Sequence, residues 1–490
     1  MSTQVLRKDD HEAGSTASSA VDSTAGGIAG ELARFALELK LEAVPLAVRE
    51  RAKHLLLDAI GLAYAAHATD FARVALDGLS VLGKGDATVI GHGRVLTARD
   101  AMVMNGVLAH GLDFDDTHSR GVIHATASLL PCVFGVSDGR PLDGAQMLAA
   151  YIAGMEAATR VGSVAKSGFH QVGFHPTGVV GIFGCALAAA RLLGLSQQQA
   201  RMAQGIALSM ASGSLEFLQD GAWTKRMHPG WAAQSAYTAA ALASRGYVGA
   251  SAPYEGRFGL FSSYLGEQRG NADLSLATAA LGDKWEIDEV AIKPVPACHF
   301  THAFADAGAA LHHEWQRRGY PLTELIGRIA RIRVKVPEGV VKVVCEPVAN
   351  KRRPANAYDA QFSVPYVTAS ALVKGRFTLD ELEPAALRDD SVLALAAKVE
   401  YEIDPASTFP RHYTGEVGLE LASGETLWHR EAVNRGSADR PLSNDEIVGK
   451  YRANARRALS DARVEKIRET VLALDTLPPG TLHRVLGEAV

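Results

Sequence analysis

Between residue 28 and about residue 285, apolar residues recur with the period of an α-helix. Ile28, Leu32 and Phe35 fall on one face of a first helix, and Pro45 opens a second one. Further helices are expected at 98–112, 144–161, 177–193, 197–212 and 230–246. Alanine, the strongest helix former, is abundant here, and no run of alternating residues indicates a strand. This part of the chain therefore predicts a large all-helical domain.

Beyond Lys293 the period changes to that of a strand. At 331–336 charged and apolar residues alternate, as they do in a half-buried strand, and the pattern recurs at 399–403. The stretch 417–428 indicates a hairpin, and helices are expected at 301–317 and 362–374. We interpret residues 291–435 as a smaller α+β domain.

The last part of the chain returns to the helical period. Ser443 and Glu446 have the spacing of a capping box, ahead of helices at 444–457 and 460–474. The expected fold is mainly α, with a large helical domain built from both chain ends, 28–290 and 436–490, and an inserted α+β domain at 291–435. Residues 1–27, rich in Ser, Thr, Ala and Gly, are expected to be a disordered extension.

The composition of the 490 residues is typical of a globular protein, with 47% hydrophobic and 21% charged residues. The net charge of −4 gives no basic field that would hold nucleic acid or an anionic membrane. The sequence has no uninterrupted run of eighteen or more apolar residues, the length from which a segment could span a bilayer. Because the four cysteines lie far apart without a CxxC pair, we expect neither disulfides nor a zinc ribbon, and a cytoplasmic location.

The densest polar cluster lies between His110 and His124. It holds three histidines and three carboxylates, which are costly to bury unless they are partnered. If the preceding helix continues through it, His110, Asp113 and Thr117 share one face. A solvated loop with a helix cap and a metal site are alternatives, although no HExxH or similar pair fixes a ligand geometry.

Three other segments carry candidate residues. His175 precedes a helix start, where free N–H groups favour an anion, unless the segment is an ordinary glycine-rich turn. Lys225, Arg226 and His228 stand just before an alanine-rich helix, where positive charge is unfavourable unless an anion offsets it. Lys293 lies at the predicted domain junction, either partly buried or in an exposed linker.

Together these segments suggest one pocket for a small polycarboxylate. Its cations would hold the carboxylates, and a positioned His or Asp would move a proton at the carbon beside one of them. Lysine can stabilise the enolate-like charge that develops there as a point charge, without a metal.

The segments 109–131, 173–195, 223–247 and 292–307 resemble those of the MmgE/PrpD family in order and spacing. Members of this family include 2-methylcitrate dehydratase, cis-aconitate decarboxylase and iminodisuccinate epimerase. The resemblance, which runs from about residue 28 to about 475, implies a helical domain made from both chain ends and an α+β lid domain. It also implies a homodimer, and an active site at the domain interface that needs no metal or organic cofactor.

The resemblance also assigns site residues, motif by motif. Matches to the family's active-site segments are Asp113, Thr117, His124, His175, Lys225 and Lys293. By analogy, both lysines and His175 hold carboxylates, while His124 or Asp113 moves the proton. Further substrate-binding candidates are Arg226, His228 and Arg257, the last of which either belongs to the site or caps a turn.

One departure concerns the lid. Several family members carry a tyrosine or another polar residue near 341–358, whereas this chain has no tyrosine there before Tyr358. Lys351, Arg352 and Arg353 offer additional positive charge instead. The departure leaves the exact substrate open.

The expected activity is that of a metal-independent carbon–oxygen or carbon–carbon lyase acting on a small di- or tricarboxylate. An epimerase or isomerase of a small dicarboxylate such as iminodisuccinate is the alternative, because both need α-proton transfer. A terpene cyclase using the DxDD pattern at 113–116 is disfavoured, since aromatics make up only 7% and lysines repel a carbocation. The remaining alternative is a non-catalytic helical scaffold, in which replacement of Lys225 and His124 would leave every activity and ligand response unchanged.

Overall fold

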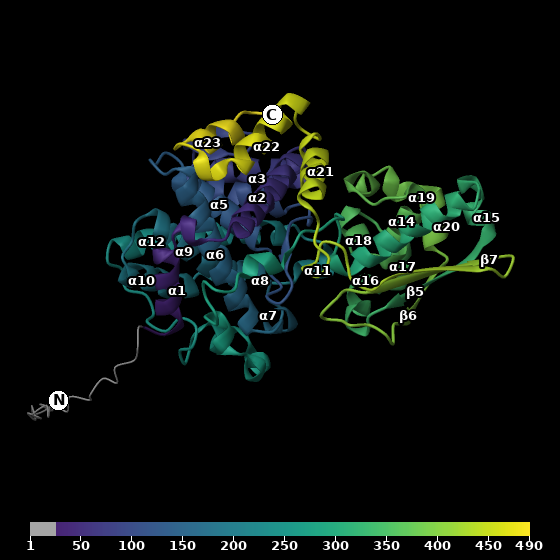
Figure 1. Ribbon diagram of the computed structural model, residues 1–490, viewed down its shortest axis with the longest axis horizontal. Helices are drawn as coiled ribbons and strands as arrows, with labels where there is room; N and C mark the ends of the chain where they lie inside the picture. Colours follow the sequence, from purple (N-terminus) through teal and green to yellow (C-terminus); the bar gives the residue numbers. More distant parts are fainter. Residues whose placement is uncertain (1–25) are drawn as a thin grey trace, which may run out of the picture.

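The computed structural model describes residues 26–490 (Figure 1). The expected N-terminal extension lies outside the described residues except for its last two, and Gly27 already begins the first helix. The chain is mainly helical, as predicted, and its buried apolar residues form two hydrophobic cores. Within residues 26–490, no helix combines the length and apolarity needed to cross a membrane.

The larger core belongs to a helical body. Helices α6 and α9 lie at its centre and are buried on almost all sides. The long helices of this part are α1 (Gly27–Glu38), α2 (Leu46–Ala66), α3 (Asp70–Leu82), α4 (Ala98–His110), α5 (Ala125–Ser137), α6 (Gly144–Val164), α9 (Gly181–Leu192), α10 (Gln197–Leu208) and α12 (Thr224–Ser244). Shorter helices are α7 (Gly168–Gln171), α8 (Pro176–Val179), α11 (Phe217–Asp220) and α13 (Leu260–Tyr264).

The C-terminal helices complete the same body. They are α21 (Asn444–Ala455), α22 (Asp461–Leu472) and α23 (Thr481–Leu486), and α21 and α22 pack against α2 (Figure 1). The predicted capping box is confirmed, because the Ser443 side chain accepts from the Glu446 N–H and the Glu446 carboxylate accepts from the Ser443 N–H. Both chain ends therefore share one hydrophobic core.

The second core lies in an α+β unit at one end of the molecule (Figure 1). Its sheet has the strand order β6-β5-β7-β8, with β5 and β6 parallel and the other pairs antiparallel. The strands are β5 (Ile329–Val336), β6 (Val399–Ile403), β7 (Gly415–Leu421) and β8 (Thr426–Glu431). The helices are α14 (His302–Arg317), α15 (Leu325–Arg328), α16 (Val341–Val344), α17 (Val348–Arg352), α18 (Ala357–Gln361), α19 (Val364–Lys374) and α20 (Asp390–Ala396).

The alternation predicted for 331–336 is confirmed. Ile332, Val334 and Val336 are buried beneath the helices of this unit, whereas Arg331 and Arg333 point to the other face. There both arginines pair with the carboxylate of Glu420 on the neighbouring strand. The period-2 pattern thus reflects one apolar and one charged face.

The helical body is not free of strands, contrary to the prediction. A hairpin joins β1 (Ala87–Val89) to β2 (Gly93–Leu96), and β3 (Thr117–His118) pairs with β4 (Val290–Ala291). These strands have only two to four residues, too few for a period-2 pattern to stand out. The β3–β4 pair matters for the site, because it places Lys293 beside the segment that follows α4.

Helix boundaries near the site also differ from the expectation. The region 177–193 forms two helices, α8 and α9, rather than one. Helix α12 begins at Thr224, so Lys225, Arg226 and His228 lie in its first turns rather than before it. The helix was expected to start at 230, after Pro229, yet it begins earlier and runs through this proline. Gly230 packs directly on the α4 backbone, where a Cβ atom would come within 2.4 Å of the Val103 carbonyl oxygen.

Candidate functional site

Six predicted residues line one small cavity of about 110 Å³ between the helical body and the α+β unit. They are Asp113, Thr117, His124, His175, Lys225 and Lys293. The other lining residues are Val122, His170, Leu215, Phe217, Leu218, Cys298, His299, Phe300, Val343, Phe362 and Tyr413. Segments that are far apart in the sequence therefore meet here, as the sequence indicated.

The segment after α4 is not helical, so the predicted shared face of His110, Asp113 and Thr117 is wrong. Helix α4 ends at His110, and Asp113 takes a left-handed backbone conformation with φ of 52°. Aspartate is one of the few residues that tolerate this conformation. Thr117 already belongs to β3.

Four successive carbonyl oxygens of this segment are held by side chains from distant parts of the chain. The Gly111 oxygen accepts from Arg226 Nε at 2.9 Å, and the Leu112 oxygen from Gln361 Nε2 at 2.8 Å. The Asp113 oxygen accepts from Lys293 Nζ and the Phe114 oxygen from Lys450 Nζ, both at 2.8 Å. Because buried carbonyls need partners, these four donors fix the irregular backbone that carries the site.

Asp113 joins the two cavity lysines. Its Oδ1 accepts from Lys225 Nζ at 2.6 Å and from Lys293 Nζ at 3.0 Å, and all three side chains are buried. Burial alone would raise the pKa of the Asp113 carboxyl, but the two ammonium groups outweigh it and hold this pKa well below its usual range. Burial disfavours the charged form of Lys293, yet the Asp113 and Asp115 carboxylates raise its pKa. Asp113 and Lys293 therefore form a charged pair at neutral pH.

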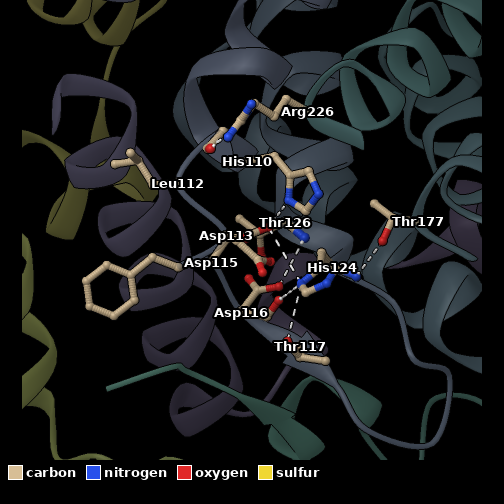
Figure 2. A network of polar contacts seen from close by, with 12 residues as sticks. His110, Leu112, Asp113, Asp115, Asp116, Thr117, His124, Thr126, Thr177 and Arg226 are labelled. Carbon is tan, nitrogen blue, oxygen red and sulfur yellow. Dashed lines mark hydrogen bonds and ion pairs between the residues drawn. The ribbon is translucent and has the colours of Figure 1, made fainter. Parts of the chain in front are cut away.

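The His124 ring is hydrogen-bonded to its own segment, while the His124 N–H donates to Thr177 Oγ1 (Figure 2). The ring Nδ1 lies 2.7 Å from the Asp116 carbonyl oxygen, to which it donates, and 3.2 Å from Thr117 Oγ1. The remaining ring nitrogen, Nε2, is then an acceptor. Burial lowers the pKa of His124 to about 3 although the Asp115 carboxylate opposes it, so the imidazole is neutral.

The two acids of this network behave differently. The Asp115 carboxylate accepts from His110 Nδ1 at 2.7 Å, and the nearby His110 and His124 rings outweigh burial and lower its pKa to about 2. Burial raises the pKa of Asp116 to about 7, although hydrogen bonds from Thr126 oppose the rise. Neighbouring carboxyls thus have pKa values far apart.

His110, Asp115 and His124 also have the spacing of a metal site, with ligand atoms within 4.8 Å of one another. Two of their atoms are already hydrogen-bonded, since His110 Nδ1 donates to Asp115 Oδ2 and His124 Nδ1 donates to the Asp116 carbonyl. His110 Nε2 and Asp115 Oδ1 are buried without a partner among residues 26–490. A metal ion bound through either Nδ1 would have to displace a hydrogen bond. The arrangement fits a hydrogen-bonded network better than a coordination sphere.

The other predicted residues lie around or outside the cavity. His228 does not line it but shares a hydrogen bond with His175, Nδ1 to Nδ1 at 3.1 Å. Burial and the charge of Lys225 hold the pKa of His175 well below its usual range, and its Nε2 is buried without a partner among residues 26–490.

Two predicted substrate-binding residues are placed elsewhere. Arg226 points away from the cavity because the next position of a helix lies about 100° around its axis from Lys225. Its side chain stacks on Phe71, 4.4 Å from the ring centre. Arg257 is exposed and lies over Phe258. Neither contacts the cavity.

Two lining residues were missed in the sequence. His299 follows Lys293 in the same motif, so its position was a usable signal. Asn434 Oδ1 accepts from the Tyr413 N–H, and its Nδ2 therefore donates to His299 Nε2 at 3.1 Å. The His299 proton is then on Nδ1, which is buried with no partner in the described chain. Burial and Lys293 lower the pKa of His299 to about 3.

Tyr413 had no signal in the sequence. It lies in the loop between β6 and β7, and its ring packs edge-on against His299, with ring centres 5.0 Å apart. Burial raises the pKa of Tyr413 to about 12, so its hydroxyl stays protonated and can donate. The α+β unit thus places a tyrosine at the cavity from outside the stretch 341–357.

Comparison with known proteins agrees with the geometry. Residues 30–272 match the MmgE/PrpD N-terminal domain and residues 295–476 match the MmgE/PrpD C-terminal domain. A cis-aconitate decarboxylase-like protein of Aspergillus oryzae is 30% identical over 93% of this chain and 96% of its own length. Human cis-aconitate decarboxylase is 29% identical over 88% of each chain, and the Aspergillus terreus enzyme is 28% identical over 94% of this chain and 96% of its own. The chain therefore belongs to the MmgE/PrpD family.

Proposed function

We propose that the protein is a metal-independent decarboxylase of a small unsaturated tricarboxylate of the cis-aconitate type. The observation that carries the proposal is the meeting of two buried lysines and several neutral imidazoles in one small cavity. The relatives described above, which are named cis-aconitate decarboxylases, support this reaction over others of the family.

The charges of the cavity suit such a substrate. Lys225 and Lys293 together exceed the charge of Asp113, and the nearby imidazoles are neutral. Carboxylates entering the cavity gain from the ammonium groups at low effective dielectric. In the proposed complex, the lysines hold two carboxylates and the Tyr413 hydroxyl donates to a third.

The reaction needs no oxidant or reductant. Cis-aconitate carries one carboxylate on a CH₂ group and one on each carbon of its double bond. The bond between the CH₂ carbon and its carboxylate breaks, CO₂ leaves, and the electron pair forms a double bond to the central carbon. The former π pair moves to the far carbon beside its own carboxylate, where one proton is added. The lysines stabilise the enolate-like charge that develops there.

His299 is the acid that we propose for this proton transfer. Its Nδ1–H is fixed by the Asn434 contact and has no partner within the described residues. The His299 imidazole is neutral in the empty cavity. The negative charge of a bound tricarboxylate raises its pKa, so that the imidazole takes up a proton when the substrate binds. His124, whose Nε2 is an acceptor, is the alternative that the geometry offers for moving a proton.

Proton NMR of the reaction in D₂O tests the proposal. Incubation with cis-aconitate should release CO₂ and give an unsaturated dicarboxylate with one deuterium on the carbon beside a carboxylate. Lys225→Ala and Lys293→Ala should each lower kcat/KM at least 100-fold, by analogy with the loss of an oxyanion donor. Lys84→Ala, which removes an exposed lysine with no ion-pair partner among residues 26–490, is the matched control and should leave kcat/KM unchanged.

The same assay separates the alternatives. Loss of water from 2-methylcitrate would favour a dehydratase over a decarboxylase. Deuterium exchange in iminodisuccinate without net turnover would favour the epimerase. Undiminished turnover in both lysine variants would contradict a role for the cavity in any of these reactions.

We also propose that a second copy of the chain covers the face made by α3 and α12. Large apolar side chains are exposed there, including Val81 at 85%, Leu82 at 72% and Trp231 at 42%. Exposed apolar patches of this kind mark interaction sites, and the family resemblance indicates a homodimer. Light scattering should give a dimer that Leu82→Asp combined with Trp231→Asp converts to a folded monomer, whereas Leu322→Asp, on the α+β unit, does not. A monomeric wild type would contradict the proposal.

A further inference from the structure

A second cleft of about 930 Å³ lies directly behind the catalytic cavity. Its walls come from the α2–α3 junction and from residues 353–361 and 379–393 of the α+β unit. It is thus a separate space between the same two parts of the molecule, and it is several times larger than the cavity of about 110 Å³.

The cleft and the cavity share a thin wall. Three chain segments form it, and in each segment neighbouring residues face opposite sides. Leu112, Arg226 and Gln361 face the cleft, whereas their neighbours Asp113, Lys225 and Phe362 face the cavity. The Arg226 and Gln361 side chains also hold the Gly111 and Leu112 carbonyls, so a group bound in the cleft touches the donors that fix Asp113.

The cleft carries an excess of positive charge. Of its four arginines, Arg457 is neutralised by Asp380 and Glu383 of the α+β unit. Arg353 and Arg388 have no ion-pair or side-chain hydrogen-bond partner within residues 26–490. Arg226 makes the bond to Gly111 alone there, and its Nη1 is buried without a partner. The cleft's own carboxylates, Asp70 and Glu383, are paired with Arg73 and Arg457.

The rest of the lining is largely apolar. Phe71, Leu112, Leu379, Leu382, Leu387 and Leu393 contribute to it. Guanidinium groups bind phosphate and carboxylate through paired N–H donors, while such an apolar wall binds a hydrocarbon or aromatic body. A ligand with both parts fits this cleft, and the volume lies in the range of small-molecule sites.

We propose that this cleft is a second ligand site, for an amphipathic organic anion larger than the substrate, with phosphate or carboxylate groups on Arg226, Arg353 and Arg388. Through Arg226 and Gln361, the bound anion acts on the segment 111–114 and hence on Asp113. The site is defined by its binding chemistry and does not depend on which reaction the cavity performs.

The test uses 8-anilinonaphthalene-1-sulfonate, a fluorescent amphipathic anion, as the probe with the full chain. Arg353→Ala combined with Arg388→Ala should weaken its saturable binding at least tenfold. Lys84→Ala combined with Arg269→Ala removes two exposed charges elsewhere, which have no ion-pair partner in the described part of the chain, and should leave binding unchanged. Inorganic pyrophosphate, which supplies only the anionic part, should displace the probe from the wild type.

Equal affinity of the probe for the two double variants would overturn the proposal, as would a failure of pyrophosphate to displace it. Hydrogen exchange of the amides at 111–116 measures the effect of the bound anion on the segment that carries Asp113, independently of activity. Pyrophosphate should slow this exchange in the wild type and not in the Arg353→Ala, Arg388→Ala variant. Unchanged exchange in the wild type would refute the action on Asp113.

Discussion

The contact between Asp113 and Lys293 offers a quantitative test of the site. Both side chains are buried, with Lys293 Nζ 3.0 Å from Asp113 Oδ1 and 2.8 Å from the Asp113 carbonyl oxygen. At an effective dielectric constant near 20, two unit charges at this distance interact by about 5.5 kcal/mol. Removal of one partner from a buried ion pair typically costs about 3–5 kcal/mol, because the other charge is left uncompensated.

A double-mutant cycle separates this interaction from the rest of the fold. Lys293→Met leaves Asp113 with Lys225 alone, and Asp113→Asn leaves two buried ammonium groups beside a neutral amide. Asp113→Asn should lower the free energy of unfolding by about 3–5 kcal/mol, because both ammonium groups lose their partner. Lys293→Met should cost less, because Lys225 still pairs with Asp113. The double variant should cost less than the two singles together, with a coupling of about 2–3 kcal/mol, because Lys293 and the Asp113 carboxylate are then both absent and neither is buried without the other. The loss of the Asp113 carboxylate beside Lys225 occurs in both Asp113→Asn variants and cancels in the cycle.

Urea denaturation followed by tryptophan fluorescence and by circular dichroism measures the cycle. Coincident curves from the two probes are needed, since a chain with two cores can unfold in steps. Lys84→Ala serves as the matched control and should lie within about 0.5 kcal/mol of the wild type. Additivity of the two single changes within about 0.5 kcal/mol would refute a direct ion pair.

Three further predictions concern the same site. Tyr413→Phe should weaken binding of citrate-like anions about two- to tenfold in thermal-shift titrations, the value of one hydrogen bond. Tyr358→Phe, which loses a hydroxyl that has no partner within residues 26–490, should not weaken it. Asp116 has a pKa of about 7 when folded and 3.8 when unfolded, so its contribution to stability is complete below about pH 4 and is lost as the pH rises to 7. Asp116→Asn should remove this decline, of up to about 4 kcal/mol, and equal pH profiles of variant and wild type would contradict the shift. Citrate binding at pH 7.5 should take up protons onto the neutral imidazoles, so calorimetric enthalpies should differ between phosphate and Tris buffers, and identical enthalpies would refute the charging of a histidine.

The elements that were predictable from the sequence are those set by local patterns. The helix that starts near Ile28 and the capping box at Ser443 follow from spacing within a single turn. The strand at 331–336 follows from its alternation, because one face meets the apolar core and the other meets the charges of neighbouring strands. In each case the residues that decide the structure lie within the element itself.

The segment after α4 was beyond such reasoning. Its apolar and polar spacing continues that of the helix, yet the chain leaves the helical path at Gly111. The carbonyl oxygens of residues 111–114 accept hydrogen bonds from side chains that lie more than 100 positions away in the sequence, namely Arg226, Gln361, Lys293 and Lys450. No local pattern records hydrogen bonds from such distant side chains. The same holds for Tyr413, which reaches the cavity from the α+β unit.

The neighbours Lys225 and Arg226 show how far a site can be predicted. Both are long, positively charged and adjacent, so the sequence suggested that both bind substrate. In the structure, Lys225 donates to Asp113 in the cavity, whereas Arg226 donates to the Gly111 carbonyl in the wall behind it. The difference is physical, because an ammonium group works as a point charge, whereas the planar guanidinium can hold a carbonyl and still offer donors to an anion. Adjacent cations can thus serve two spaces, one for the reacting carboxylates and one for a larger anion, and the wall they share connects the two.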